Sequence, residues 1–424
     1  MNYEETLEFI HNYTWKGCTP GLDRIKELLS FMGNPQDELK YVHVAGTNGK
    51  GSTCSMLASI LEIAGYKTGL FTSPHIYEFN ERIKINGENI TNDELCEIAE
   101  YVRSFLDKMS EKPTEFELIS AMGFEYFKRK KCDIVVVEVG LGGTMDSTNV
   151  IKAPEVAVIA AIGLDHTGML GNTVEEIALE KAGIIKQETK AVVYNQKESV
   201  NKVFIDVAKS LGVEVEFSED DKIELVSRNL DYQEFNYKDL KNLRIPLSGT
   251  YQLKNAALVL KTVQVLKEKG YEISAGAIAE GMRDTKWPSR FEVFSKKPVI
   301  IVDGAHNPQG IAATAKSLKE HFADNKIIFV IGVMDDKDLD SMIPYIAELA
   351  GEFITVTPDY EGRALSAMQL GEYLNKYNVP VSVCDSVMQG IELALKKAGN
   401  EGIICALGSL YLTAEVENCL KMIK

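Results

Sequence analysis

A glycine-rich stretch near the N-terminus contains the residue types that bind phosphate. It reads VAGTNGKGST over residues 44–53, so two apolar residues lead into a turn with one lysine and then hydroxyls. Glycines let the main chain approach an anion closely, and the amide groups at a helix N-terminus favour negative charge. Lys50 adds a positive charge, and Ser52 or Thr53 offers a hydroxyl to Mg²⁺. The stretch predicts a phosphate-binding loop between a strand and a helix.

The spacing of this loop differs from that of the commonest phosphate loop, G-x-x-x-x-G-K-[ST]. Gly51 separates Lys50 from Ser52, and residue 44 is a valine. A plain strand-to-helix turn with a solvated lysine is the alternative interpretation. The strand pattern before the loop and the helical pattern after it favour phosphate binding, because ligands of parallel sheets bind at the carboxyl ends of strands.

Three further polar side chains come at the ends of apolar runs that are typical of strands. Ser73 ends one run, Glu138 interrupts DIVVVEVG (133–140), and His166 follows VAVIAAIG (156–163). A buried carboxylate is costly unless it is paired or bound to a metal. Because these strand ends should be neighbours, the three residues predict one Mg²⁺ site beside the phosphates. Taken singly, Ser73 is an ordinary turn serine and His166 is more often structural than ligating.

The stretch VIIVDGAHNP (299–308) repeats this pattern in the second half of the chain. Asn307 followed by Pro308 is a good N-cap and first-turn pair for a helix. Capping explains Asn307, but it explains neither Asp303 nor His306. These two residues are therefore candidates for a site.

The sequence around two more charged residues, Arg290 and Lys181, does not by itself assign them to a site. Arg290 lies just before the predicted domain boundary, from where it could reach a phosphate in a cleft in which ATP contacts both halves. Lys181 lies in EKAGIIK (180–186), where charged and apolar residues alternate as on a helix. From the sequence alone, Lys181 is a helix-surface lysine.

The elements that must position these residues alternate along the chain. Apolar runs with strand composition are separated by helical patterns such as 22–32, 55–65 and 116–130, which is typical of a parallel sheet covered on both faces. The runs of the first half are 41–46, 68–73, 133–140, 156–163 and 191–195. Those of the second half are 299–308, 326–335, 353–359, 379–385 and 402–412.

These patterns predict an α/β protein of two domains. A P-loop-containing ATPase domain with a mainly parallel sheet would cover residues 1–293, and a smaller Rossmann-like domain would cover residues 294–424. The turn-rich stretch 284–293 supports this boundary. Residues 214–247 are polar with short alternating runs, which indicates a small antiparallel excursion.

Composition restricts the classes of function. The 424 residues carry a net charge of −16, which is unfavourable for sequence-independent nucleic-acid binding. No basic region precedes an apolar run at the N-terminus, and the most apolar stretch, 156–164, is too short to span a bilayer. The seven cysteines form no C-x-x-C pair, which indicates reduced thiols in a cytoplasmic protein.

Together the motifs resemble those of the folylpolyglutamate synthase/dihydrofolate synthase family, within the Mur ligase superfamily. They appear in family order over nearly the whole chain. The carrying motifs are AGTNGKGS (45–52), FTSPH (71–75), FNERI (79–83), EVGLGG (138–143), LDHTGMLG (164–171), EKAGIIK (180–186), LSGTYQLKNAA (247–257), PSRFE (288–292), DGAHNP (303–308) and GSLYL (408–412).

The resemblance implies a role for each candidate. ATP would be bound by Gly46, Thr47, Asn48, Gly49, Lys50, Gly51, Ser52, Asn255, Arg290 and Asp303. Mg²⁺, at one or two sites, would be held by Ser52, Ser73, Glu138, His166 and, as a carbamylated lysine, Lys181. The catalytic residues would be Lys50, Glu138, His166, Lys181 and His306. The folate or pterin would contact Gly21, Leu22, Arg24, Thr114, Phe116 and Asp146.

The implied reaction joins L-glutamate to a folate, or to dihydropteroate, through an acyl phosphate made from ATP. No redox cofactor, nucleic acid or membrane is implied, and the resemblance indicates a monomer. Two departures concern dihydropteroate rather than ATP or folate: Thr144 replaces an arginine of many relatives, and CTPGLDRI (18–25) lacks an aspartate before Gly21.

Three rival functions stay open at this point. Another Mur-type ligase, acting on a cell-wall precursor, would share the ATP-binding residues but lack the pterin-side segments 71–83 and 114–117. A regulator that binds ATP without ligation would tolerate loss of Lys50 or Glu138, and both are present. A small-molecule kinase would not need the additional Gly51.

Overall fold

The computed structural model describes residues 1–13, 20–323, 325–360 and 362–423. Its residues divide into two compact units. Unit 1 consists of Met1–Glu224, Asn236–Leu243 and Lys254–Thr285, and unit 2 consists of Leu225–Phe235, Arg244–Leu253 and Lys286–Lys424. The predicted boundary between residues 293 and 294 stays a prediction.

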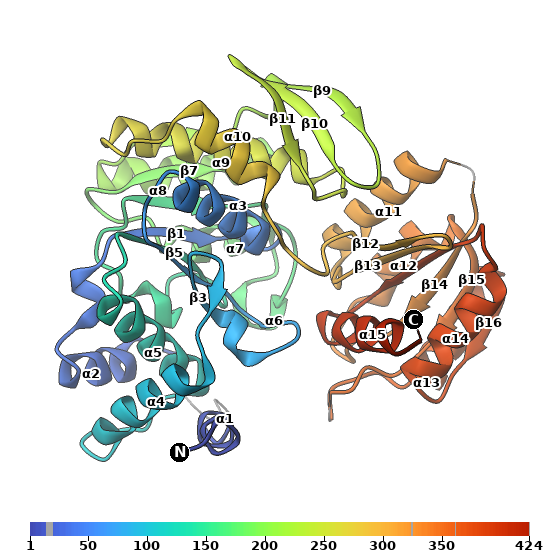
Figure 1. The fold of residues 1–424 in the computed structure, drawn as a ribbon, viewed down its shortest axis with the longest axis horizontal. Helices are drawn as coiled ribbons and strands as arrows, with labels where there is room; N and C mark the ends of the chain where they lie inside the picture. Colours follow the sequence, from blue (N-terminus) through green and yellow to red (C-terminus); the bar gives the residue numbers. More distant parts are fainter. Residues whose placement is uncertain (14–19, 324, 361, 424) are drawn as a thin grey trace. The chain divides into compact units, whose positions relative to one another are not determined.

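Unit 1 is built on a mostly parallel sheet (Figure 1). Its strand order is β4-β3-β2-β5-β1-β6-β7-β8. The two edge strands β3 and β4 are antiparallel, and the other pairs are parallel. The strands are β1 (Tyr41–Ala45), β2 (Thr68–Phe71), β3 (Ile83–Ile85), β4 (Glu88–Asn89), β5 (Ile134–Glu138), β6 (Val156–Ile159), β7 (Lys190–Val193) and β8 (Val215–Phe217).

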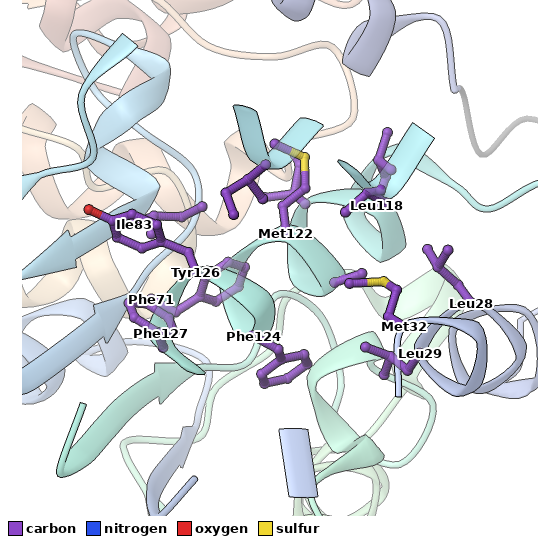
Figure 2. Packing of buried hydrophobic residues seen from close by; sticks show 14 of the residues in the cluster. Leu28, Leu29, Met32, Phe71, Ile83, Leu118, Met122, Phe124, Tyr126 and Phe127 are labelled. Carbon is purple, nitrogen blue, oxygen red and sulfur yellow. The ribbon is translucent and has the colours of Figure 1, made fainter. Parts of the chain in front are cut away.

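Helices cover both faces of this sheet, as continuous apolar strands require. The helices are α1 (Tyr3–His11), α2 (Asp23–Phe31), α3 (Lys50–Ile63), α4 (Asn92–Leu106), α5 (Glu115–Arg129), α6 (Thr167–Leu170), α7 (Val174–Ala182), α8 (Glu198–Leu211), α9 (Gln252–Glu268) and α10 (Ala275–Arg283). Figure 2 shows part of the core on one face, where side chains of α2 and α5 gather with Phe71 and Ile83 of the sheet. The predicted α/β class is confirmed.

The register of β1 brings the predicted strand ends together. Val44 pairs with Glu138 of β5, and Ala45 pairs with Ile159 of β6. The glycine loop that follows β1 therefore starts at the same edge of the sheet as Glu138. This neighbourhood is the one that the sequence patterns predicted.

The helix that follows the glycine loop is fixed by a close backbone contact. α3 packs against α10, and a Cβ added at Gly281 would lie 2.5 Å from the Cα of Ile60. The Ser59 hydroxyl donates to the Gly281 carbonyl at 2.7 Å. Only a glycine allows two helices to approach this closely without displacement.

Unit 2 contains a second sheet, of order β12-β13-β17-β14-β15-β16, in which only the β12–β13 pair is antiparallel. α11, α12 and α13 cover one face, and α14 and α15 cover the other. The strands are β12 (Glu292–Lys296), β13 (Val299–Asp303), β14 (Ile327–Ile331), β15 (Ala350–Thr355), β16 (Val381–Val383) and β17 (Ile403–Leu407). The helices are α11 (Pro308–Phe322), α12 (Leu339–Ala347), α13 (Ala367–Leu374), α14 (Val387–Ala398) and α15 (Leu410–Ile423).

Two boundaries differ from the sequence prediction. The predicted excursion over 214–247 is shorter, because β8 joins the sheet of unit 1 and the small separate sheet contains only β9 (Ile223–Arg228), β10 (Gln233–Tyr237) and β11 (Leu240–Ile245). The predicted strand 402–412 ends at Leu407, where Gly408 has a φ of 115° and α15 then begins.

Within the described ranges, no helix is both long and apolar enough to cross a membrane. The cysteines in those ranges, which are Cys54, Cys96, Cys132, Cys384, Cys405 and Cys419, all have free thiols. Cys18 lies outside the described residues.

Candidate functional site

The glycine loop connects β1 to α3 as the sequence predicted. Gly49 is the N-cap of α3 and has a φ of 86°, in the left-handed region that glycine adopts without strain. A Cβ added at Gly49 would lie 2.7 Å from Oδ1 of Asn255, so this buried asparagine lies directly against the turn. The structure therefore brings Asn255 of α9 to the predicted phosphate loop.

The first amide groups of the loop donate hydrogen bonds to another segment of unit 1. The Thr47 and Asn48 amides donate to the Ala161 carbonyl at 2.8 and 3.1 Å, which fixes the loop to the segment after β6. The first turn of an α-helix has no helical acceptors for its amide groups. The groups best placed to bind phosphate are therefore those of Lys50, Gly51 and Ser52 at the start of α3.

Lys50 and Glu138 lie close together at this edge of the sheet. Their Nζ and Oε1 atoms are 3.9 Å apart, and Glu138 is buried. The Ser73 amide donates to the other Glu138 oxygen at 3.3 Å, so the ends of β2 and β5 meet as predicted. His166 has a φ of 49° and a side chain that is 40% exposed, with Nε2 lying 3.9 Å from Asp165.

The burial of Lys181 differs most from what the sequence alone predicted. It is not on the helix surface, because only 4% of the residue is exposed. Burial, and then the charge of Lys50, lower its pKa from the usual 10.5 to about 7. Asp165 and Asp146 oppose this shift, which places both carboxylates in the electrostatic neighbourhood of Lys181. A lysine with this pKa is partly uncharged near neutral pH, so its amine can react as a nucleophile.

Asp146 lies at the N-terminus of the short helix η3 (Ser147–Val150), and it is buried. It accepts hydrogen bonds from the Leu141 amide at 2.8 Å and from the amide and hydroxyl of Thr148. Burial raises the pKa of Asp146, and these hydrogen bonds oppose the rise.

The Thr148 hydroxyl extends this network to β1. It lies 2.8 Å from Nε2 of His43, which is fully buried in the strand. Because Thr148 donates to Asp146, His43 must donate to Thr148 through a protonated Nε2. Burial lowers the His43 pKa to about 3, so the ring is neutral.

Three further residues that are predicted to contact folate, Arg24, Thr114 and Phe116, form a group around α5. Glu117 accepts from the side chain of Arg24 at 3.1 Å and from the Thr114 amide at 2.6 Å, and Thr114 also caps α5. Phe116 lies over Gly140, where an added Cβ would be 2.5 Å from its ring. An added Cβ at Gly140 would also lie 3.2 Å from Asp146, so Phe116 and Asp146 are neighbours.

The other two predicted pterin contacts lie at the start of α2. Leu22 is the N-cap of this helix, and a Cβ added at Gly21, just before it, would have no atom of the described residues within 4 Å. This segment reaches the group around α5 through the buried Arg24.

In unit 2, Asp303 ends β13 and is buried. Its carboxylate accepts from the Ala305 amide at 2.9 Å, from the Thr314 hydroxyl at 3.0 Å and from the Tyr251 hydroxyl at 3.4 Å. Burial raises the pKa of Asp303, and the charge of Arg290 opposes this. The predicted capping by Asn307 is confirmed, because its side chain accepts from the Gly310 amide.

Arg290 lies in an unusual turn. Its neighbours Ser289 and Phe291 have φ values of 56° and 52°, which are rare for residues with side chains. The Arg290 side chain passes over Gly304, where an added Cβ would clash with its guanidinium. His306 is close by, with Nδ1 at 2.8 Å from the Gly304 carbonyl.

Sequence reasoning missed the residues that support this site. Four of them make hydrogen bonds to a predicted residue: Thr148, Glu117, Thr314 and Tyr251. His43 acts one step further away, through its contact with Thr148. The best available signal was the polar His43 inside the apolar strand YVHVA, which parallels Glu138 inside IVVVE. Within the described part of the chain, no three His, Cys, Asp or Glu side chains form a group that could hold a metal ion.

Comparison with known families divides the chain into two matching regions. The profile described as the Mur ligase middle domain matches residues 44–263, and the profile described as the Mur ligase glutamate ligase domain matches residues 289–410. The first match starts at the glycine loop and ends within α9.

Full-length relatives are also found. The chain is 35% identical over 431 residues to a folylpolyglutamate synthase of Lacticaseibacillus casei, covering 99% of each. It is also 35% identical to a dihydrofolate synthase/folylpolyglutamate synthase of Bacillus subtilis, again covering 99% of each. A solved structure of Escherichia coli FolC in complex with DHPP and ADP is 30% identical, with a TM-score of 0.88 over 100% of this chain and 98% of that one.

Proposed function

Because the chain belongs to the folylpolyglutamate synthase/dihydrofolate synthase family of Mur ligases, we propose that it joins L-glutamate to a folate in a reaction driven by ATP. The enzyme is an ATP-dependent acid–amino acid ligase, and the family predicted from the motifs is confirmed. The rival cell-wall ligase shares the two Mur ligase profiles, but the full-length relatives are named for folate ligation.

One observation supports this proposal more than the others: the buried charges beside the glycine loop. Lys50, at the first position of α3, lies 3.9 Å from the buried Glu138, and the charge of Lys50 helps to lower the pKa of Lys181. A lysine beside a buried carboxylate at the end of a central strand is costly for stability. Phosphoryl transfer needs such fixed charges, because it depends on positioning and on stabilisation of developing negative charge.

The donor set at this edge fits Mg²⁺, which prefers oxygen ligands and usually keeps several waters. Glu138 offers a carboxylate, and Ser73 and Ser52 offer hydroxyls at the same edge of the sheet. His166 and a carbamylated Lys181 complete the proposed set. A bound Mg²⁺ would neutralise charge on the phosphates of ATP.

The chain's own residues would act on the two half-reactions by binding and orientation. The acceptor carboxylate attacks the γ-phosphorus of ATP, the bond to the β-phosphate oxygen breaks, and ADP leaves. The α-amine of glutamate then attacks the acyl phosphate, loses a proton and expels phosphate. Lys50 and the first amides of α3 would hold the phosphates, and Asn255 would contact adenine beside Gly49.

On the acceptor side, Asp146, Phe116, Thr114, Arg24 and the segment Gly21–Leu22 would contact the pterin. The proposed roles in unit 2 are nucleotide contacts for Arg290 and Asp303 and a place near the reacting groups for His306. We propose folate as the main acceptor, with dihydropteroate as a second one, and a monomeric enzyme.

The test is ADP release by the purified protein with Mg-ATP and L-glutamate, with tetrahydrofolate and dihydropteroate compared as acceptors. Turnover with tetrahydrofolate is expected, and turnover with dihydropteroate would show that the Thr144 departure is harmless. Absence of glutamate-dependent ADP release with both acceptors would overturn the proposed function.

A further inference from the structure

The segment Gly143–Asn149 contacts the helix that carries Lys181 through several backbone groups. The amide and the hydroxyl of Thr144 both donate to the Glu180 carbonyl, at 2.9 and 3.0 Å. A Cβ added at Gly143 would lie 2.8 Å from the Cα of Lys181. The Glu180 carbonyl, near the end of α7, thus accepts from Thr144 as well as from the Gly183 amide at 3.3 Å.

Asn149 adds a side-chain link between this segment and α7. Its side-chain amide donates to the Thr144 carbonyl at 3.0 Å and to the Gly183 carbonyl at 3.2 Å. Gly183 is the C-cap of α7, so Asn149 joins the segment to the end of the helix two residues after Lys181. Asn149 is 6% exposed, and no donor in the described chain reaches its Oδ1.

The same segment holds Asp146 on its other side. Asp146 is fixed by Leu141 and Thr148, and Thr148 is fixed by His43 of β1. These seven consecutive residues therefore include a proposed acceptor contact, Asp146. They also contact the C-terminal turn of α7 and, through Thr148, the strand β1 that leads into the glycine loop.

We propose that Asn149 is a positioning residue, which locks the segment Gly143–Asn149 to α7 and so holds Lys181 in register with Asp146. This inference rests on the proposed roles of Lys181 and Asp146 in folate ligation. Asn149 itself touches neither ATP nor acceptor in this assignment. Misplacement of a reacting group by about 1 Å can lower turnover by about 10²-fold.

The first experiment compares Asn149→Ala with a matched control, Asn201→Ala. Asn201 of α8 is also an asparagine of unit 1 whose side-chain amide makes two hydrogen bonds, to Asn195 at 2.9 Å and to the Gln196 carbonyl at 3.3 Å. We expect Asn149→Ala to lower kcat by about 10- to 100-fold with KM for ATP changed less than about 3-fold. Asn201→Ala should leave kcat near the parent value, even where it lowers thermal stability.

A second readout needs no turnover. Lys181 is labelled with an amine-reactive reagent in the nucleotide-free protein, and the modified peptide is quantified by mass spectrometry. Asn149→Ala should speed labelling of Lys181 about 5-fold or more, and Asn201→Ala should not, because only the first variant loosens the turn around the buried lysine.

The pair Thr144→Val and Thr144→Ser keeps the inference testable should Asn149→Ala fail to fold. Serine keeps the hydroxyl that donates to Glu180, and valine removes it. Loss of kcat in Thr144→Val with near-normal kcat in Thr144→Ser is expected. Unchanged kcat or unchanged Lys181 labelling in the folded Asn149 variant, or equal kcat in both Thr144 variants, would overturn the inference. An inactive parent enzyme would instead overturn the proposed function, and the labelling would still test the positioning.

Discussion

Each unit buries a carboxylate at the carboxyl end of a parallel strand, and the two carboxylates have different surroundings. Glu138 in unit 1 has a lysine ammonium at 3.9 Å and the Ser73 amide at 3.3 Å, and both contacts are long. Asp303 in unit 2 accepts from the amide of Ala305 and from the hydroxyl of Thr314 at 2.9 and 3.0 Å.

The difference suits two roles of a buried carboxylate: one stabilises the fold, and the other responds to a bound ligand. Short hydrogen bonds from neighbouring residues make Asp303 an anchor that joins the end of β13 to α11. The 3.9 Å contact between Glu138 and Lys50 can change when a phosphate or a cation binds. We therefore expect substitutions beside Glu138 to change turnover more than stability, and substitutions beside Asp303 to do the reverse.

The largest effect is expected for Lys50→Ala. Loss of one fixed positive charge at the developing phosphoryl charge should lower kcat/KM for ATP by about 10³-fold. The exposed Lys152, which pairs with Asp37, provides the control Lys152→Ala. Initial rates of ADP release measure both variants, and a loss below 10-fold in Lys50→Ala would contradict the role assigned to the loop.

Lys181→Met is expected to have the next largest effect, again on turnover rather than on stability. Methionine fits the space of a buried lysine and has no charge to desolvate, so the melting temperature should not fall. Turnover should fall by about 10²-fold, because the amine is lost from the site. Differential scanning fluorimetry and ADP release test the two halves of this prediction, and a clear drop in melting temperature would instead indicate a structural lysine.

The buried His43 should make unit 1 sensitive to acid. Its folded pKa of about 3 is below the unfolded value of 6.5, so the unfolded state takes up a proton as pH falls from 6.5 toward 3. The stability that comes from a neutral His43 is complete above pH 6.5 and is lost below it. Between pH 7 and pH 5 this residue should lower the free energy of unfolding by about 2 kcal/mol.

His43→Gln provides the check, because glutamine keeps an N–H donor for Thr148 and does not titrate. Urea unfolding at pH 7 and pH 5 should show a smaller decrease in the variant than in the parent. The same decrease in both proteins would show that other groups set the acid sensitivity.

Thr314→Val is expected to have the smallest effect, and it tests unit 2. It removes a hydroxyl donor from the buried Asp303 at nearly constant volume, which should lower the free energy of unfolding by about 1–2 kcal/mol. Thr314→Ser, which keeps the donor, should cost less. A change in kcat/KM for ATP without a change in stability would break the distinction between the two units.

The sequence predicted the α/β class, the glycine loop and the meeting of Ser73 with Glu138, because apolar strands and the residues at their ends are local patterns. It did not predict the burial of Lys181, since α7 alternates charged and apolar residues and its covering comes from the segment Gly143–Asn149. It also missed the His43–Thr148 contact, which joins residues more than 100 positions apart.

The contact between α3 and α10 has a consequence for synthesis of the chain. Ser59 and Gly281 are 222 positions apart, so the helix that follows the glycine loop leaves the ribosome long before the helix that covers it. A nascent chain that ends before α10 leaves an apolar face of α3 uncovered. The helix that follows the glycine loop is thus among the first parts of unit 1 to be translated and among the last to be covered.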